Sequence, residues 1–122
     1  MDDDLRMCIK MNPLEVTKLL SDEYTVKILT ATFNLPRSAN YLSAKFNIPI
    51  AACYRRIRDL ERMELLQVSE KILTPQGKRV KLYRSNLKSA YLKFENGRLK
   101  ALLELSGHQD GEEEEIWNVA KS

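Results

Sequence analysis

Four arginines and a tyrosine crowd one short stretch near the middle of the chain, between residues 54 and 62. A guanidinium group can donate two hydrogen bonds to the edge of a guanine and can equally bind a phosphate. At helical spacing, Arg55, Arg58 and Arg62 fall on the side of Tyr54, opposite the apolar residues of the stretch. The pattern is typical of a helix that offers cations to a polyanion, although arginines also solvate many ordinary surface helices.

The residues around these arginines predict two short helices joined by a tight turn. Ser38 is a favourable N-cap, because its hydroxyl can accept from a backbone amide one turn later. Asn47 can adopt the left-handed conformation that often ends a helix, and Pro49 suits the first turn of the next helix, which we expect over 49–63. Two helices separated by about three residues indicate a helix-turn-helix.

A basic hairpin is expected directly after the second helix. Residues 66–74 and 80–84 have the composition of strands and are separated by turn residues. Lys78, Arg79 and Lys81 lie at or near the tip, where we expect them to contact phosphates. The alternative is that they only keep an edge hairpin from pairing with other chains, as lysines often do.

Residues 12–85 resemble the ArsR-like winged-helix transcriptional regulators of bacteria and archaea, in particular the small archaeal ones. The motif that carries the resemblance is Ile48-Pro-Ile-Ala-Ala-Cys-Tyr-Arg-Arg-Ile-Arg-Asp-Leu-Glu-Arg-Met-Glu-Leu-Leu66, which fits the family's recognition helix without a gap. Family members often have a glycine where Glu64 stands, so this helix must end differently. The resemblance implies that five positions face DNA, namely Ile50, Ala51, Tyr54, Arg55 and Arg58.

Metal and cofactor sites are not expected. The two cysteines, Cys8 and Cys53, are far apart and form no metal-binding pair, so the metal sensing of some relatives is not implied. Cys53 falls on the apolar side of its helix and is predicted to be a buried free thiol. The candidate DNA-binding residues are Ser38, Ile50, Ala51, Ala52, Tyr54, Arg55, Arg56, Arg58, Arg62, Lys78, Arg79 and Lys81.

The charge of the 122-residue chain is unevenly distributed. Residues 37–98 hold 14 Lys and Arg against 5 Asp and Glu, whereas residues 1–36 and 99–122 are both net acidic. The overall charge is only +3, so the cations are concentrated in the stretch that contains the predicted helices and hairpin. This is the distribution expected of a nucleic-acid-binding protein.

Two further helices and a second hairpin complete the predicted elements. One helix begins after Asn12 and another spans 21–34 with Val26 in its core stripe; the leucines of the first fit either the core or a dimer interface. The Asn96-Gly97 dipeptide is a strong hairpin signal and predicts a hairpin over 91–105. Residues 99–105 taken alone also fit a helix. The apolar face of the hairpin needs a partner, either this domain or a second subunit.

The sequence therefore predicts a fold that is mainly α with small β. It would be a winged helix-turn-helix of three to four helices with a β-wing and a C-terminal β-hairpin. We expect an N-terminal arm over 1–11, the DNA-binding domain over 12–85, the hairpin over 86–105 and an acidic mobile tail over 106–122.

The predicted function is that of a sequence-specific transcriptional regulator that binds double-stranded DNA as a homodimer. The alternative is a winged-helix protein-interaction module, because fold does not fix function. No residue pattern suggests an enzyme. No apolar run is long enough to span a membrane, and the acidic start does not fit a secretory signal, so a cytoplasmic protein is expected.

Overall fold

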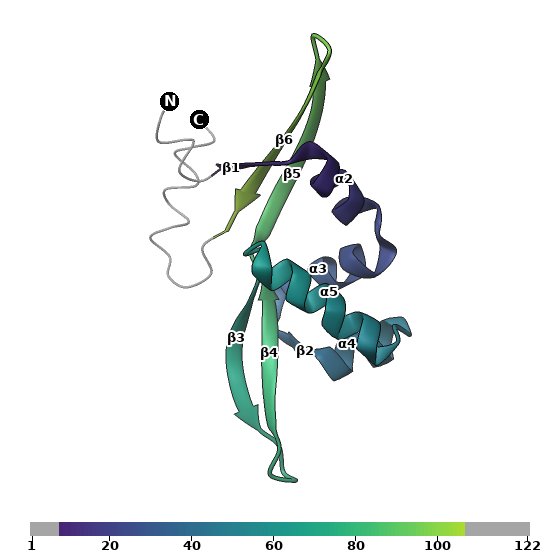
Figure 1. The fold of residues 1–122 in the computed structure, drawn as a ribbon. Coiled ribbons are helices and arrows are strands. Elements are labelled where there is room, and N and C mark those ends of the chain that lie inside the picture. Colours follow the sequence, from purple (N-terminus) through teal and green to yellow (C-terminus); the bar gives the residue numbers. More distant parts are fainter. Residues whose placement is uncertain (1–7, 107–122) are drawn as a thin grey trace. The chain divides into compact units, whose positions relative to one another are not determined.

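The computed structural model describes residues 8–106, which form two compact units (Figure 1). One unit contains residues 8–21 and 86–106, and the other contains residues 22–85. The helices are α2 (Pro13–Ser21), α3 (Glu23–Asn34), α4 (Ala39–Phe46) and α5 (Ile50–Arg62). The strands are β1 (Cys8–Met11), β2 (Arg37–Ser38), β3 (Leu66–Leu73), β4 (Arg79–Ser85), β5 (Leu87–Glu95) and β6 (Arg98–Leu105).

The predicted fold class, mainly α with small β in a winged helix-turn-helix, is wrong. The described residues form a mixed α/β structure, in which four helices accompany two antiparallel sheets of three strands each. The strand orders are β1-β6-β5 and β2-β4-β3. Both hairpins were expected; β2 was not, and residues 8–11, predicted as the end of an N-terminal arm, form β1. Strands β1 and β2 have four and two residues, too few to show a periodic pattern, and each gives a hairpin its third strand.

The helix pair α4–α5 is capped as its sequence predicts. Ser38 Oγ accepts a hydrogen bond from the backbone N–H of Tyr41 at 3.1 Å. Asn47 has φ of 55° and donates its N–H to the carbonyl of Ser43, which ends α4. Pro49 occupies the N-cap of α5 rather than its first helical position. The sequence thus determines both ends of the turn between the two helices.

A left-handed glutamate follows α5. Glu64 has φ of 64°, a conformation in which most side chains are disfavoured, and its N–H donates to the carbonyl of Glu61 at 2.9 Å. The next amide, of Leu65, returns to the carbonyl of Leu60 at 2.9 Å. The chain therefore leaves α5 through the kind of left-handed turn for which glycine is the usual residue.

The inner face of α5 supplies much of the core of residues 22–85. Cys53, Ile57 and Leu60 are each at most 1% exposed, as their spacing predicts. Cys53 is a free thiol whose Sγ lies 3.6 Å from the carbonyl oxygen of Ala39, and burial raises its pKa. The prediction of a buried, unpaired cysteine is confirmed.

The inner face of α3 differs from its prediction. Val26 was expected in the core but is 38% exposed, whereas Thr25 and Thr32 are buried. Thr32 Oγ1 donates to the carbonyl of Ile28 at 2.7 Å, so its hydroxyl is satisfied within the helix. Because a threonine can hide its hydroxyl in this way, a pattern based on apolar residues alone misjudged the rotation of the helix.

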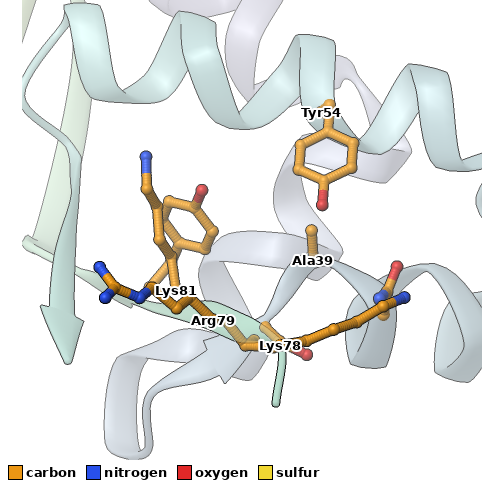
Figure 2. A pocket seen from close by; sticks show the side chains of 9 residues that line it. Ala39, Tyr54, Lys78, Arg79 and Lys81 are labelled. Carbon is orange, nitrogen blue, oxygen red and sulfur yellow. The ribbon is translucent and has the colours of Figure 1, made fainter. Parts of the chain in front are cut away.

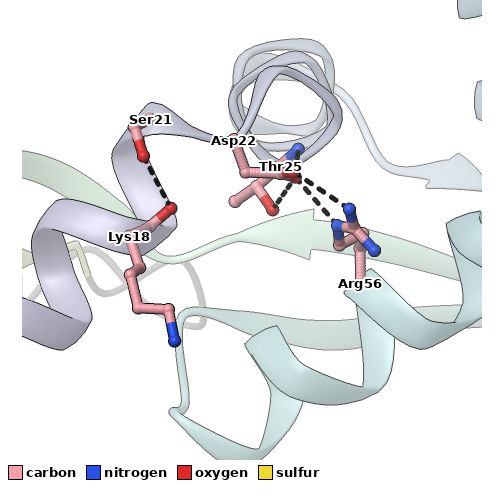
Figure 3. Close-up of polar contacts among 5 residues, drawn as sticks. All are labelled: Lys18, Ser21, Asp22, Thr25 and Arg56. Atoms are coloured by element: carbon pink, nitrogen blue, oxygen red, sulfur yellow. Dashed lines mark hydrogen bonds and ion pairs between the residues drawn. The ribbon is translucent and has the colours of Figure 1, made fainter.

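One ion pair joins α5 to the start of α3 (Figure 3). Arg56 donates from Nε to Oδ2 of Asp22 at 2.8 Å and from Nη2 to Oδ1 at 3.0 Å. Asp22 is also the N-cap of α3, and its Oδ2 accepts from the backbone N–H of Thr25 at 2.9 Å and from its hydroxyl at 2.8 Å. The hydrogen bond from Arg56 and those from Thr25 hold the pKa of Asp22 well below its usual range, against the opposing effect of burial.

The other unit contains the sheet β1-β6-β5 and α2, which packs against β6. Asn12 caps α2 as expected, because its Oδ1 accepts from the backbone N–H of Leu14 at 2.9 Å. A two-residue loop at Asn96-Gly97 sets Glu95 opposite Arg98, so the predicted hairpin is confirmed and a helix over 99–105 is excluded. The predicted acidic tail lies outside the described residues from 107 onward, and the predicted N-terminal arm (1–11) lies outside them up to residue 7.

We predict that D22N lowers the free energy of unfolding by about 2 kcal/mol at neutral pH, since it leaves the half-buried Arg56 without its counter-ion. The folded state lowers the pKa of Asp22, so the stabilisation is complete above the unfolded pKa of about 3.9 and is lost as pH falls through the folded pKa. Urea unfolding should therefore show a difference between wild type and D22N that narrows in acid.

The matched control for this prediction is D59N. Asp59 pairs with Arg62 at 3.0 Å, but the two side chains are 46% and 72% exposed, so its removal should cost less than about 0.5 kcal/mol. If D22N and D59N lowered the free energy of unfolding equally, the Asp22–Arg56 pair would stabilise the fold no more than an exposed ion pair does.

Candidate nucleic-acid interface

A cationic groove of about 410 Å³ lies between α4, α5 and the β3–β4 hairpin. Figure 2 shows Tyr54 reaching from α5 toward Ala39 at the start of α4, with three cationic side chains of the hairpin around the same space. The buried Tyr83 also lines the groove, and burial raises its pKa. The full lining is Ser38, Ala39, Asn40, Tyr54, Lys78, Arg79, Val80, Lys81 and Tyr83.

A tight turn places the cations at the end of the hairpin. The backbone N–H of Thr74 donates to the carbonyl of Lys78 at 2.8 Å, and the N–H of Lys78 returns to Thr74 Oγ1 at 3.1 Å. Gly77 between them has φ of 84°, a backbone conformation that is costly for a residue with a side chain. The turn therefore fixes where Lys78 and Arg79 leave the backbone.

The base of the hairpin is attached to α3. Arg84 on β4 donates from Nε to the carbonyl of Phe33 at 3.3 Å and from Nη2 to that of Asn34 at 3.2 Å. A cation suits the C-terminal end of a helix, where carbonyls have no partner within the helix. This contact connects the hairpin to the same helix that Asp22 connects to α5.

Two lysines face each other directly across the hairpin. Lys71 on β3 is paired with Lys81 on β4, and both are exposed. Like charges directly opposite destabilise a sheet. On the other hairpin Lys93 also lies opposite Lys100, but Lys93 has an ion pair with Glu95 at 3.2 Å. Among residues 8–106 no carboxylate forms an ion pair with Lys71 or Lys81, so no ion pair offsets the repulsion between them.

The outer face of α5 is exposed as its periodicity predicts. Ile50 is 43% and Tyr54 is 40% exposed. The remaining predicted side chains on this face are Ala51, Arg55, Arg58 and Arg62, all exposed. Of the α5 residues, however, only Tyr54 lines the groove, so the arginines form a second cationic surface on the same helix.

Other predicted site residues have contacts within the protein. Arg56 donates hydrogen bonds to Asp22, and its Cζ lies 5.5 Å from the centroid of the Tyr24 ring. We therefore assign Arg56 to the fold and not to the interface. Ser38 caps α4 and lines the groove as well. Ala52 is half-buried. The structure therefore brings together Ser38, Tyr54, Lys78, Arg79 and Lys81.

The sequence analysis missed Asn40 and Lys71. Asn40 is exposed in the first turn of α4 and lines the groove, and its position two residues after the N-cap was the available signal. Lys71 could be found only from the strand register, because a shift between Val68 and Glu70 decides which residue lies opposite Lys81.

No protein-family model matches the chain, and no curated protein matches it significantly in sequence. The resemblance to ArsR-like regulators thus depends on the recognition-helix motif alone and stays a prediction. Within residues 8–106, no group of three or more His, Cys, Asp or Glu is placed to hold a metal ion. None of the four helices of that part of the chain is both long and apolar enough to cross a membrane.

We predict that K71E stabilises the protein by about 0.5 kcal/mol at low ionic strength, because it replaces a repulsive cross-strand pair by an attractive one. Salt should screen this gain, since both side chains are exposed. Urea unfolding at low and high salt measures the effect, and K71Q should show a smaller gain. A K71E protein that is no more stable than wild type at low salt would contradict the repulsion.

Proposed function

We propose that the chain binds double-stranded DNA in a sequence-specific manner and regulates transcription. The observation that carries the proposal is that Tyr54 of α5 and three cations of the β3–β4 hairpin line one groove. A polyanion that follows the outer face of α5 would meet those cations without any change in the fold. The proposal includes a homodimer that acts in the cytoplasm.

In this proposal α5 enters the major groove, whose width of about 12 Å admits a helix. Small residues at its N-terminal end allow a close approach, and Arg55 and Arg58 are long enough to reach base edges from the next turn. The first-turn amides of α5 have no side-chain cap, because Pro49 offers none. Such amides suit phosphate oxygens, as helix N-termini generally do.

The hairpin cations have a different part in the proposal. Lys78, Arg79 and Lys81 bind phosphates beside the groove, which fixes the position of α5 but reads no sequence. The mutual repulsion of Lys71 and Lys81 is relieved when a phosphate lies near both. Base reading and phosphate binding are therefore assigned to different elements, and separate substitutions can test them.

A protein-interaction module is the second candidate. It is favoured by Ile72 and Leu73, which are 41% and 69% exposed near the end of the same hairpin. Titration with random duplex DNA separates the two candidates. A DNA-binding protein should bind more weakly as salt rises, because binding releases counter-ions, whereas an interaction module should show little binding at any salt concentration.

We predict that R55A/R58A weakens binding to the preferred duplex by about 1–3 kcal/mol for each arginine that reads a base, with relaxed specificity. Fluorescence anisotropy with preferred and scrambled duplexes measures both effects. The control is R98A/K100A, which removes the same charge from the β5–β6 hairpin. Unchanged binding by R55A/R58A would refute the assignment of α5.

We predict that K78Q/K81Q weakens binding to all duplexes alike and lowers the slope of log affinity against log salt by about two. The preferred sequence should not change, because phosphate contacts carry no sequence information. Affinities measured over a series of salt concentrations give the slope. A change in sequence preference with an unaltered slope would instead place these side chains at base edges.

A further inference from the structure

The β5–β6 hairpin extends past the rest of its sheet. β1 pairs with β6 only from Ala101 to Glu104, so beyond Met11 the sheet narrows to two strands. Figure 1 shows this hairpin continuing beyond β1 and α2. Every residue from Tyr91 to Lys100 is exposed. A two-stranded hairpin alone in water is marginally stable, so this extension needs a partner.

One face of the extension is apolar and uncharged. Phe94 is 74% exposed, Leu92 is 44% exposed and Leu99 is 37% exposed, and all three lie on this face according to the strand register. Nearer the base of the hairpin, Ala101 and Leu103 on the same face are buried, in the unit where α2 packs against β6. The apolar face is therefore covered at one end and bare at the other.

The outer edge of β5 is also available. Among the described residues, β5 pairs with β6 and with no other strand, so it forms one edge of the sheet. A register shift lies between Leu87 and Ser89, and from Ser89 to Glu95 the pairing with β6 is regular. A long regular edge beside an exposed apolar face is a template for pairing with another chain.

We propose that β5 pairs with β5 of a second copy, antiparallel and about a two-fold axis at Leu92. The two sheets then join into one sheet of six strands. This contact is isologous, so it closes after two copies. The inference does not depend on DNA binding, and it supplies a specific interface for a dimer.

The apolar residues select this register. In an antiparallel pair, directly opposed residues share a face. An axis at Leu92 sets Leu92 opposite Leu92 of the second copy, and Phe94 opposite Ala90 of the second copy. The apolar face then runs across the junction without interruption. An axis at Tyr91 would instead set Phe94 opposite Lys88 of the second copy.

The charges on the other face fit the same register. Lys93 lies opposite Tyr91 of the second copy, and Glu95 lies opposite Ser89 of the second copy, so no like charges meet directly. An axis at Lys93 would oppose that lysine to itself. An axis at Phe94 would leave very few paired residues, because β5 ends at Glu95. Of these four axes, the one at Leu92 joins the apolar faces, opposes no like charges and keeps a long overlap.

The antiparallel direction also decides which parts of the two hairpins meet. It places the bare end of each hairpin beside the base of the other, where Ala101 and Leu103 are buried. Each copy thus pairs with the edge of β5 that the other leaves open.

Disulfide cross-linking of the full chain tests this register. In a C8S background, L92C should cross-link under mild oxidation, because its two copies lie about 5 Å apart between Cα atoms. F94C should not cross-link, since the Cα atoms at position 94 of the two copies lie about 14 Å apart. The double variant A90C/F94C should cross-link, because position 90 of one copy lies opposite position 94 of the other. Cys53 is fully buried and serves as an unreactive internal thiol. Non-reducing gels report the products.

Sedimentation equilibrium of the unmodified chain, without DNA, should give twice the mass of one chain, and F94K should shift it toward the monomer. Leu92 and Phe94 are exposed, so these variants should fold, which circular dichroism checks. A monomer at all accessible concentrations would overturn the proposal, as would a dimer in which F94C cross-links and L92C does not. The cross-linking and sedimentation experiments contain no DNA. They therefore test the dimer whether or not R55A/R58A weakens DNA binding.

Discussion

The surface that α5 offers to a partner depends on how its inner side is held. Cys53, Ile57 and Leu60 are buried along one stripe, and Arg56 beside them is fixed by two hydrogen bonds to Asp22. These contacts set the rotation of the helix about its axis. At about 100° per residue, Tyr54 and the remaining arginines must then face outward. One ion pair and three apolar side chains therefore determine which cations of α5 face outward.

The hairpin cations depend on a related constraint. Arg84 attaches β4 to the end of α3, while Asp22 attaches α5 to its beginning, so one helix positions both cationic elements. Lys71 and Lys81 are held opposite each other by the strand register, although the pairing is repulsive. Such a pair persists only because the rest of the fold holds the two strands in this register. The other unit exposes an apolar face on its hairpin instead.

The sequence predicted the local features well, because each depends on neighbouring residues. The cap at Ser38, the left-handed Asn47 and the register around Asn96-Gly97 all follow from short-range rules. It failed where the partner lies far along the chain. Arg56 looked like one more DNA-facing arginine, because its partner Asp22 stands 34 residues earlier. For the same reason β1 and β2 escaped prediction: each pairs with a strand more than 40 residues later, and their omission gave the wrong fold class.

The claim that the outer face of α5 reads DNA can be tested most directly by mapping the contact. Duplexes would be enriched from a random pool on the full chain, and the best would be titrated into isotope-labelled protein followed by nuclear magnetic resonance. The account predicts that amide shifts concentrate in residues 50–58 and 78–81. Failure to enrich any duplex, or shifts confined to the β5–β6 hairpin, would contradict it.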